Sequence, residues 1–191
     1  MRKALFLSGL FFLLLWPKDG LADGKYYVFV YGGKFSPTEF RKMPFKKWHL
    51  KDECLAALAV GKELWAYRDR LALELEAQIV KHWGEQDNYQ EYVAAFNLRW
   101  KKFPWNSYLK TTIAFGQGLS YTDTVPDQEK KVNRKSAHLL NYLMYEVESV
   151  LLGFSRWSLV FRVHHRSGIF GLMKGVDGAS NYPCLGIKYK Y

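Results

Sequence analysis

The pattern of hydrophobic and polar positions in this chain repeats every second residue over much of its length. From Leu71 to Ile79, the odd-numbered positions are apolar, and the even-numbered ones include Glu74, Glu76 and Gln78. A period of two indicates a β-strand with one apolar face and one polar face. The same alternation predicts eight strands, at residues 25–32, 54–60, 71–81, 91–100, 108–119, 139–152, 157–167 and 181–191.

One part of this assignment has an alternative. Residues 52–81 are rich in alanine, leucine and glutamate, which all favour helices. An amphipathic helix in that region is therefore the competing interpretation. Elsewhere the segments have roughly the length of a membrane-spanning strand, about ten residues.

The polarity of the two strand faces suggests which face is enclosed. Nine charged residues lie on the predicted interior face: Glu74, Glu76, Glu91, Arg99, Glu146, Glu148, Arg162, Lys188 and Lys190. A polar interior with an apolar exterior is typical of outer-membrane barrels. The fold class that follows is all-β, a single eight-stranded antiparallel transmembrane β-barrel of the outer-membrane type, with a polar interior filled by side chains. Because an unpaired buried charge is costly, we expect Glu146 and Glu148 to pair with Arg162.

A soluble, lipocalin-like barrel, with the apolar faces turned inward, is compatible with the same alternation. Two observations favour the membrane instead. Tyrosine and tryptophan gather near the predicted strand ends, as they do at membrane interfaces. The final residue, Tyr191, is aromatic and in phase with the apolar face.

The N-terminus has the features of a secretory signal peptide. Arg2 and Lys3 precede an apolar run, and Gly20-Leu21-Ala22 offers a small-x-small cleavage site. We predict a signal peptide at residues 1–22, with a retained N-terminal anchor as the alternative, and an outer-membrane barrel domain at residues 23–191. The expected location is the outer membrane of a Gram-negative bacterium, with insertion by the barrel-assembly machinery. Outer loops are expected at 33–53, 82–90, 120–138 and 168–180, and inner turns at 61–70, 101–107 and 152–155.

The formal net charge of +10 favours anionic partners. Export argues against nucleic acid, which leaves phosphate-bearing membrane lipid. Lys42, Lys46 and Lys47 lie in the basic first outer loop and are candidates to bind lipid head groups, although an ordinary solvated surface explains them equally well. Cys54 and Cys184 are read as packed thiols, and no cysteine or histidine motif suggests a metal or a cofactor.

The seventh predicted strand carries the candidate chemistry. Its apolar stripe runs into His165 and Ser167, which share a face because they are two residues apart. A hydrolase needs a nucleophile, a base, a group that orients the base, and donors for the oxyanion. Asp177 is the candidate orienting acid, and the backbone N–H of Gly168 is a candidate oxyanion donor. His164 belongs to the interior phase and is expected to contact the interior acids.

The C-terminal third of the chain resembles a known family. The motifs HHRSGIFG and SNYPCLGIKYKY, preceded by LLNYLMYEVE, are similar to those of the outer-membrane lipid A 3-O-deacylases and acyloxyacyl-hydrolase-like barrels. The resemblance implies an eight-stranded barrel that releases an ester-linked acyl chain from lipid A of lipopolysaccharide, with Ser167 as nucleophile, His165 as base and a carboxylate as orienting group.

The chain departs from that family at two positions. Gly168 stands where the family carries an asparagine, and Ala179 stands where it carries a glutamate. Asn181 could supply the missing oxyanion donor from the last strand. Two functions from different classes therefore follow: an outer-membrane esterase that acts on lipid A or a related outer-leaflet lipid, and a non-catalytic barrel with a structural or binding role.

Overall fold

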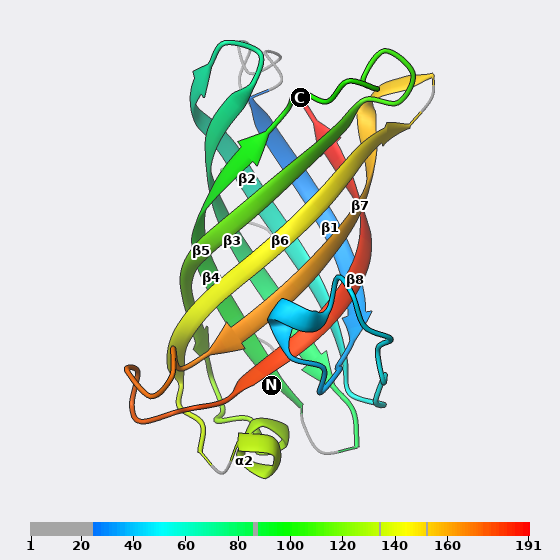
Figure 1. The fold of residues 1–191 in the computed structure, drawn as a ribbon. Helices are drawn as coiled ribbons and strands as arrows, with labels where there is room; N and C mark the ends of the chain where they lie inside the picture. The colour runs from blue at the N-terminus through cyan, green and yellow to red at the C-terminus, as the bar shows by residue number, and fades with distance from the viewer. Residues whose placement is uncertain (1–24, 86–87, 134, 152) are drawn as a thin grey trace, which may run out of the picture.

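The computed structural model describes residues 25–85, 88–133, 135–151 and 153–191 of the chain (Figure 1). The predicted signal peptide, residues 1–22, lies outside the described residues. Eight antiparallel strands close into one barrel in sequence order. They are β1 (Tyr26–Lys34), β2 (Cys54–Tyr67), β3 (Leu71–Trp83), β4 (Asn88–Trp100), β5 (Thr111–Thr122), β6 (Leu139–Leu151), β7 (Phe154–Ser167) and β8 (Ala179–Lys190). Among the described residues, no helix is long and apolar enough to cross a membrane.

The eight-strand prediction is confirmed, and the helix alternative for residues 52–81 is wrong. That region forms β2 and β3, which pair continuously apart from one irregularity near Glu63 and Trp65. Pairing along both edges outweighs the local helix propensity. Because β2 extends to Tyr67, the turn expected at 61–70 shrinks to residues 68–70. The next turn is longer than expected, since β5 begins only at Thr111.

The barrel interior holds a network of buried charges. The Arg162 guanidinium donates to Glu76 at 2.7 and 2.9 Å and also pairs with Glu146. The expected Glu146–Arg162 pair is thus confirmed, whereas Glu148 pairs instead with Lys188 at 3.2 Å. Such geometry offsets the cost of burying the charges, because each carboxylate faces at least one cation.

The outer wall is apolar. Large hydrophobic side chains are exposed on all eight strands, and they include Val30, Leu75, Ile79, Phe96, Leu98, Phe115, Leu119, Val147, Leu159, Leu185 and Ile187. Aromatic residues near the strand ends, among them Trp65, Tyr67, Trp83, Trp100, Tyr121 and Trp157, are also exposed. A charged interior inside an apolar wall is the arrangement of an outer-membrane barrel rather than a soluble one.

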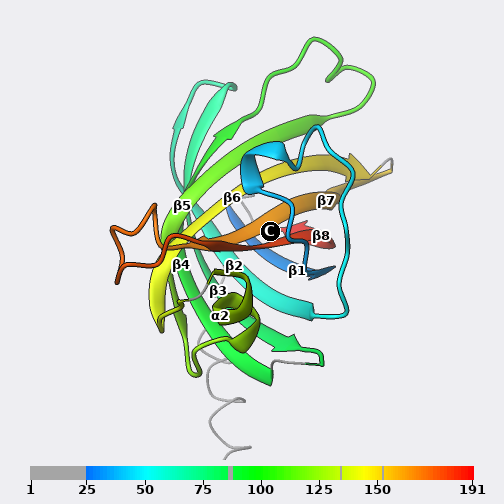
Figure 2. The same ribbon diagram turned by 60° about the horizontal axis from the view of Figure 1, so that its bottom comes forward.

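The two ends of the barrel differ. One end, the turn end, carries the connections 68–70 and 101–110 together with the C-terminus. The other, the loop end, carries residues 35–53, the connection from β3 to β4, the short helix α2 (Asp127–Asn133) and residues 168–178; Figure 2 brings it forward. Residues 35–53, here called the strap, include the 3-10 turn η1 (Phe40–Lys42) and lie against the outside of β7 and β8 (Figure 1).

Candidate active site

The candidate site lies on the outer face of β7, where that strand reaches the loop end. Its inward-facing neighbours fix the phase of the strand: His164 contacts Glu91 and Arg166 donates to Ser120 inside the barrel. His165 and Ser167 alternate with them and therefore face outward. The predicted contact between His164 and the interior acids is confirmed. Across the sheet, His165 lies opposite Asn181 of β8.

Asn181 holds the imidazole of His165. Its Oδ1 lies 2.5 Å from His165 Nδ1, and its Nδ2 donates to the backbone carbonyl of Thr38 in the strap at 3.0 Å. An amide oxygen can only accept, so Nδ1 carries the proton. The neutral ring then keeps its lone pair on Nε2, which is the nitrogen that a general base uses.

The structure places Asn181, and not Asp177, against His165. Asp177 is exposed in the loop 168–178, with its carboxylate beside Gly171. Among the described residues, no hydrogen bond joins it to His165, because that loop folds back on itself away from the imidazole: Gly171 donates its N–H to the carbonyl of Val176. The sequence alone does not pair His165 with Asn181, because that pairing depends on the register between β7 and β8.

Ser167 is half-buried and lies two positions beyond His165 on the same face. Side chains at that spacing begin about 7 Å apart along a strand and approach one another by rotamer choice. Within the part of the chain that the structure describes, the Ser167 hydroxyl makes no hydrogen bond. It is therefore available to a bound substrate.

The two candidate oxyanion donors are both in use. The Gly168 N–H donates to the carbonyl of Gly178 at 3.3 Å, and Asn181 Nδ2 donates to Thr38. A Cβ atom at Gly168 would lie 2.0 Å from the Val176 carbonyl oxygen, so glycine is required here by the close approach of the loop. This explains why an asparagine does not fit after Ser167 in this chain.

The two residues that come directly after Gly168 have a strained backbone. Ile169 and Phe170 have φ angles of +51° and +52°, a conformation that is costly for a β-branched residue such as Ile169. Their N–H groups make no backbone hydrogen bond among the described residues. They are the free backbone donors that lie nearest in sequence to Ser167.

The strap covers the histidine, which sequence analysis did not predict. The Phe40 ring stacks on the His165 ring with centroids 4.3 Å apart, and His165 is only 6% exposed. Further along the strand, Trp48 stacks on Phe161 at 5.4 Å with an angle of 5° between the rings. The aromatic residues Phe40 and Trp48 in an otherwise basic loop were the feature of the sequence that could have indicated packing against the barrel.

The strap also carries the predicted head-group lysines. Lys46 and Lys47 are exposed, whereas the Lys42 ammonium pairs with Glu39. Hydrogen bonds from Lys42 and Arg41 lower the pKa of the Glu39 carboxyl, so that group stays ionised and neutralises part of the strap. Lys46 and Lys47 remain the more available of the three for an anionic ligand.

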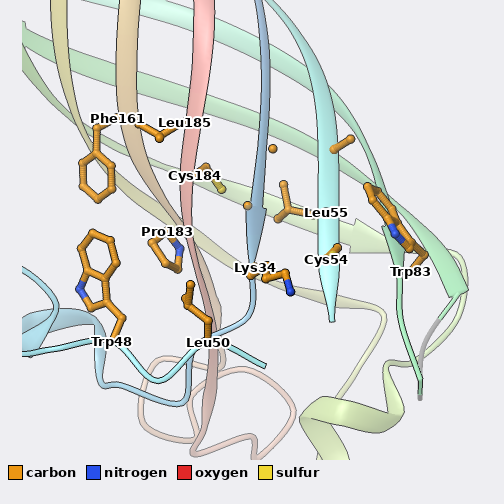
Figure 3. A pocket seen from close by; sticks show the side chains of 13 residues that line it. Lys34, Trp48, Leu50, Cys54, Leu55, Trp83, Phe161, Pro183, Cys184 and Leu185 are labelled. Atoms are coloured by element: carbon orange, nitrogen blue, oxygen red, sulfur yellow. The ribbon is translucent and has the colours of Figure 1, made fainter. Parts of the chain in front are cut away.

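An apolar pocket of about 720 Å³ opens between the strap and the barrel wall (Figure 3). Trp48 and Leu50 of the strap face Phe161 and Leu185 of the wall, and among the described lining residues Lys34 alone is charged. Cys54 and Cys184 also line the pocket, and both are free thiols. Phe161 lies four residues before His165 on the same face, a separation of about 13 Å. The pocket therefore lies beside the histidine's strand and extends across β8, β1 and β2 to Trp83 of β3.

Comparison with known proteins adds evidence on the fold. No family model and no curated protein matches the sequence. The solved structure titled "Crystal structure of the outer membrane enzyme PagL" superposes with a TM-score of 0.58 at 16% identity, over 85% of this chain and 98% of that one. Neisserial surface protein A (NspA) superposes with a TM-score of 0.52 at 10% identity, over 88% of this chain and 98% of that one. The fold is that of an outer-membrane barrel. Likeness at this level of identity shows the fold alone, so the evidence for a function must come from the residues of the site.

Proposed function

We propose that this protein is an outer-membrane esterase that removes an ester-linked acyl chain from lipid A or a related outer-leaflet lipid. The observation that carries the proposal is the hydrogen bond between His165 Nδ1 and Asn181 Oδ1, on the same outward face as Ser167. A polar triad on a lipid-facing wall needs a reason, because that wall is otherwise apolar. An ester at the membrane surface supplies one.

The reaction has two steps, acylation of Ser167 and hydrolysis of the acyl-enzyme. Ser167 Oγ attacks the ester carbonyl while His165 Nε2 takes the hydroxyl proton, and the Asn181 amide oxygen holds the resulting imidazolium in place. The imidazolium then protonates the departing alkoxide, which leaves an acyl group on Ser167. Water, deprotonated by His165, then attacks the acyl ester, and the imidazolium returns its proton to Ser167 Oγ as the fatty acid leaves. Asn181 takes the role given to Asp177 in the sequence-based hypothesis, as an asparagine does in the Cys-His-Asn sites of papain-like proteases.

Backbone donors complete this arrangement. Since the N–H of Gly168 is already bonded, the free N–H groups of Ile169 and Phe170 are the candidates to stabilise the oxyanion. Their strained left-handed conformation turns two successive amides out of the β-sheet pattern. Backbone strain of this kind concentrates at functional sites.

The surroundings suit an anionic lipid. The pocket beneath Trp48 and Leu50 offers an apolar channel for an acyl chain, and Lys46 and Lys47 lie exposed on the same strap for a phosphate-bearing head group. Residence in the outer membrane of a Gram-negative bacterium, after cleavage of residues 1–22 and insertion by the barrel-assembly machinery, would bring the site to lipopolysaccharide. The mechanism calls for no metal or cofactor.

A non-catalytic barrel is the second candidate, and one observation favours it. Asn181 Nδ2 and the Gly168 N–H are both occupied, and Phe40 covers His165. On this interpretation the His165–Asn181 hydrogen bond serves to fasten the strap. Ser167 then has no chemical role.

Mass spectrometry of lipid A separates the two functions. The protein, Ser167→Ala and the control Ser155→Ala are expressed in a Gram-negative strain that lacks its own lipid A deacylases. Ser155 is an exposed serine near the opposite end of β7. We expect loss of one ester-linked acyl chain with the protein and with Ser155→Ala, and intact lipid A with Ser167→Ala. Intact lipid A in all three strains, with each barrel folded in the outer membrane, would contradict the esterase proposal for this lipid.

A further inference from the structure

A second group of reactive side chains lies inside the barrel, on the opposite side of the wall from Ser167. His82 of β3, Glu91 of β4 and His164 of β7 are each fully buried, with one potential ligand atom apiece within 4.8 Å of the others. His82 Nε2 lies 2.7 Å from Glu91 Oε2, and His164 Nε2 lies 3.1 Å from the same oxygen. Two imidazoles therefore converge on one carboxylate.

This spacing is close to that of a metal coordination shell. Ligand atoms about 2.0 to 2.1 Å from a tetrahedral zinc ion lie about 3.3 Å from one another. The two nitrogen–oxygen separations of 2.7 and 3.1 Å fall about 0.6 and 0.2 Å below that value, and all three ligand atoms lie within 4.8 Å of one another, so small side-chain shifts would bring them into a coordination shell. Because the ligands come from three different strands of a closed barrel, their backbones are held in a fixed arrangement.

The surrounding hydrogen bonds are those of ligands that are held in position. Tyr31 OH lies 3.0 Å from His164 Nδ1, and Ser120 Oγ donates to Glu91 Oε1 at 2.5 Å. Partners of this kind orient the ligands of protein-bound metals. His82 Nδ1 is buried and has no hydrogen-bond partner among the described residues.

Charge provides an independent argument. In the central network of the interior, four carboxylates face four basic side chains: Glu74, Glu76, Glu146 and Glu148 against Arg99, Arg162, Lys188 and Lys190. Among the described residues, the hydrogen-bonded group that includes Glu91 also contains Glu129 but only one guanidinium, that of Arg166. With neutral histidines, this group carries one excess negative charge, which favours a bound cation.

We propose that His82, Glu91 and His164 bind a divalent transition metal of the zinc class inside the barrel. Two imidazole nitrogens and one carboxylate oxygen form the donor set typical of zinc, with a fourth position left for water. The ion joins three strands near the loop end, and it bears no relation to the chemistry of Ser167, which lies outside the barrel. The metal site is independent of the esterase proposal.

The test uses full-length mature protein without a histidine tag, refolded in detergent in the presence of Zn²⁺ and then freed of unbound metal. Zinc per chain is measured by elemental mass spectrometry for the protein, His82→Ala, Glu91→Gln and the control His49→Ala. His49 is exposed in the strap. We expect one equivalent of zinc with the protein and with His49→Ala, and none with the other two. Co²⁺ in place of Zn²⁺ should give visible d–d absorption in the same two proteins only.

Folding is checked by the heat-dependent gel mobility of the barrel. Glu91→Gln keeps the size and shape of Glu91, so it reports on the ligand if His82→Ala fails to fold. Retention of zinc by a folded Glu91→Gln barrel, or its absence from the unsubstituted protein, would overturn the proposal. The three side chains would then form a hydrogen-bonded network only.

Discussion

The sharpest prediction concerns Asn181. In Asn181→Ala, the His165 imidazole loses the acceptor that lies 2.5 Å from Nδ1, and the ring is free to rotate or change tautomer. The lost bond becomes charge-assisted when the imidazolium forms, and hydrogen bonds to charged groups contribute about 1.5–3 kcal/mol. At about 1.4 kcal/mol for each factor of ten, acyl release should slow roughly 10- to 150-fold. Initial rates are measured on purified lipopolysaccharide in detergent by mass spectrometry.

Two matched variants identify the cause of that loss. Asp177→Ala removes the carboxylate that sequence analysis favoured, and its rate should stay close to that of the unsubstituted protein. Asn181→Asp keeps an acceptor for Nδ1 but loses the donor to the Thr38 carbonyl, so its rate should exceed that of Asn181→Ala. A large loss in Asp177→Ala with little change in Asn181→Ala would refute the assignment of Asn181 as the orienting residue.

Three further predictions concern the barrel interior, the loop that follows β7 and the strap. Arg162→Met leaves buried carboxylates short of a cation and should lower the free energy of unfolding by about 3–5 kcal/mol in urea titrations; an unchanged midpoint would contradict the interior network. Gly168→Ala forces a Cβ to within 2.0 Å of the Val176 carbonyl oxygen and should cost about 1–3 kcal/mol by the same measurement. Phe40→Ala removes the ring stacked on His165, a contact that contributes about 1 kcal/mol, so a serine-directed phosphonate should label the protein roughly fivefold faster. Equal labelling rates would show that Phe40 does not limit access.

The strands could be predicted from the sequence because each obeys a local rule. Inward charges such as Glu76 and Arg162 alternate with outward residues such as Leu75 and Phe161. This period of two can be recognised within one strand, without knowing which strands pair with it. Strand ends were harder, because Tyr67 belongs to β2 only through its pairing with Leu71. The same limit applies to the charge pairs. Arg162 pairs with Glu146 of β6 as expected, but its bidentate partner is Glu76 on β3, a contact across the barrel interior that no local pattern encodes.

The sequence located the candidate site but did not identify the residue that orients His165. His165 and Ser167 lie on one face by spacing alone, whereas the orienting group depends on the register between β7 and β8. Proximity in sequence favoured Asp177, and register favours Asn181. The strap escaped prediction because loops follow no period, so nothing before the structure placed Phe40 on the histidine.

Asn181 links the strap to the histidine that would act as the base. Its side chain donates to the Thr38 carbonyl and accepts from His165, and its backbone carbonyl accepts from the N–H of Ser36 in the strap. The first of these contacts fixes the amide so that Oδ1, rather than Nδ2, faces the imidazole. If the strap moves and Thr38 leaves, the amide is free to turn and present a donor to Nδ1, which would favour the tautomer that cannot act as a base at Nε2. The esterase proposal therefore requires that any movement of the strap that uncovers His165 leaves its Thr38 end bound, so that such a movement belongs to the Phe40–Trp48 part of the loop.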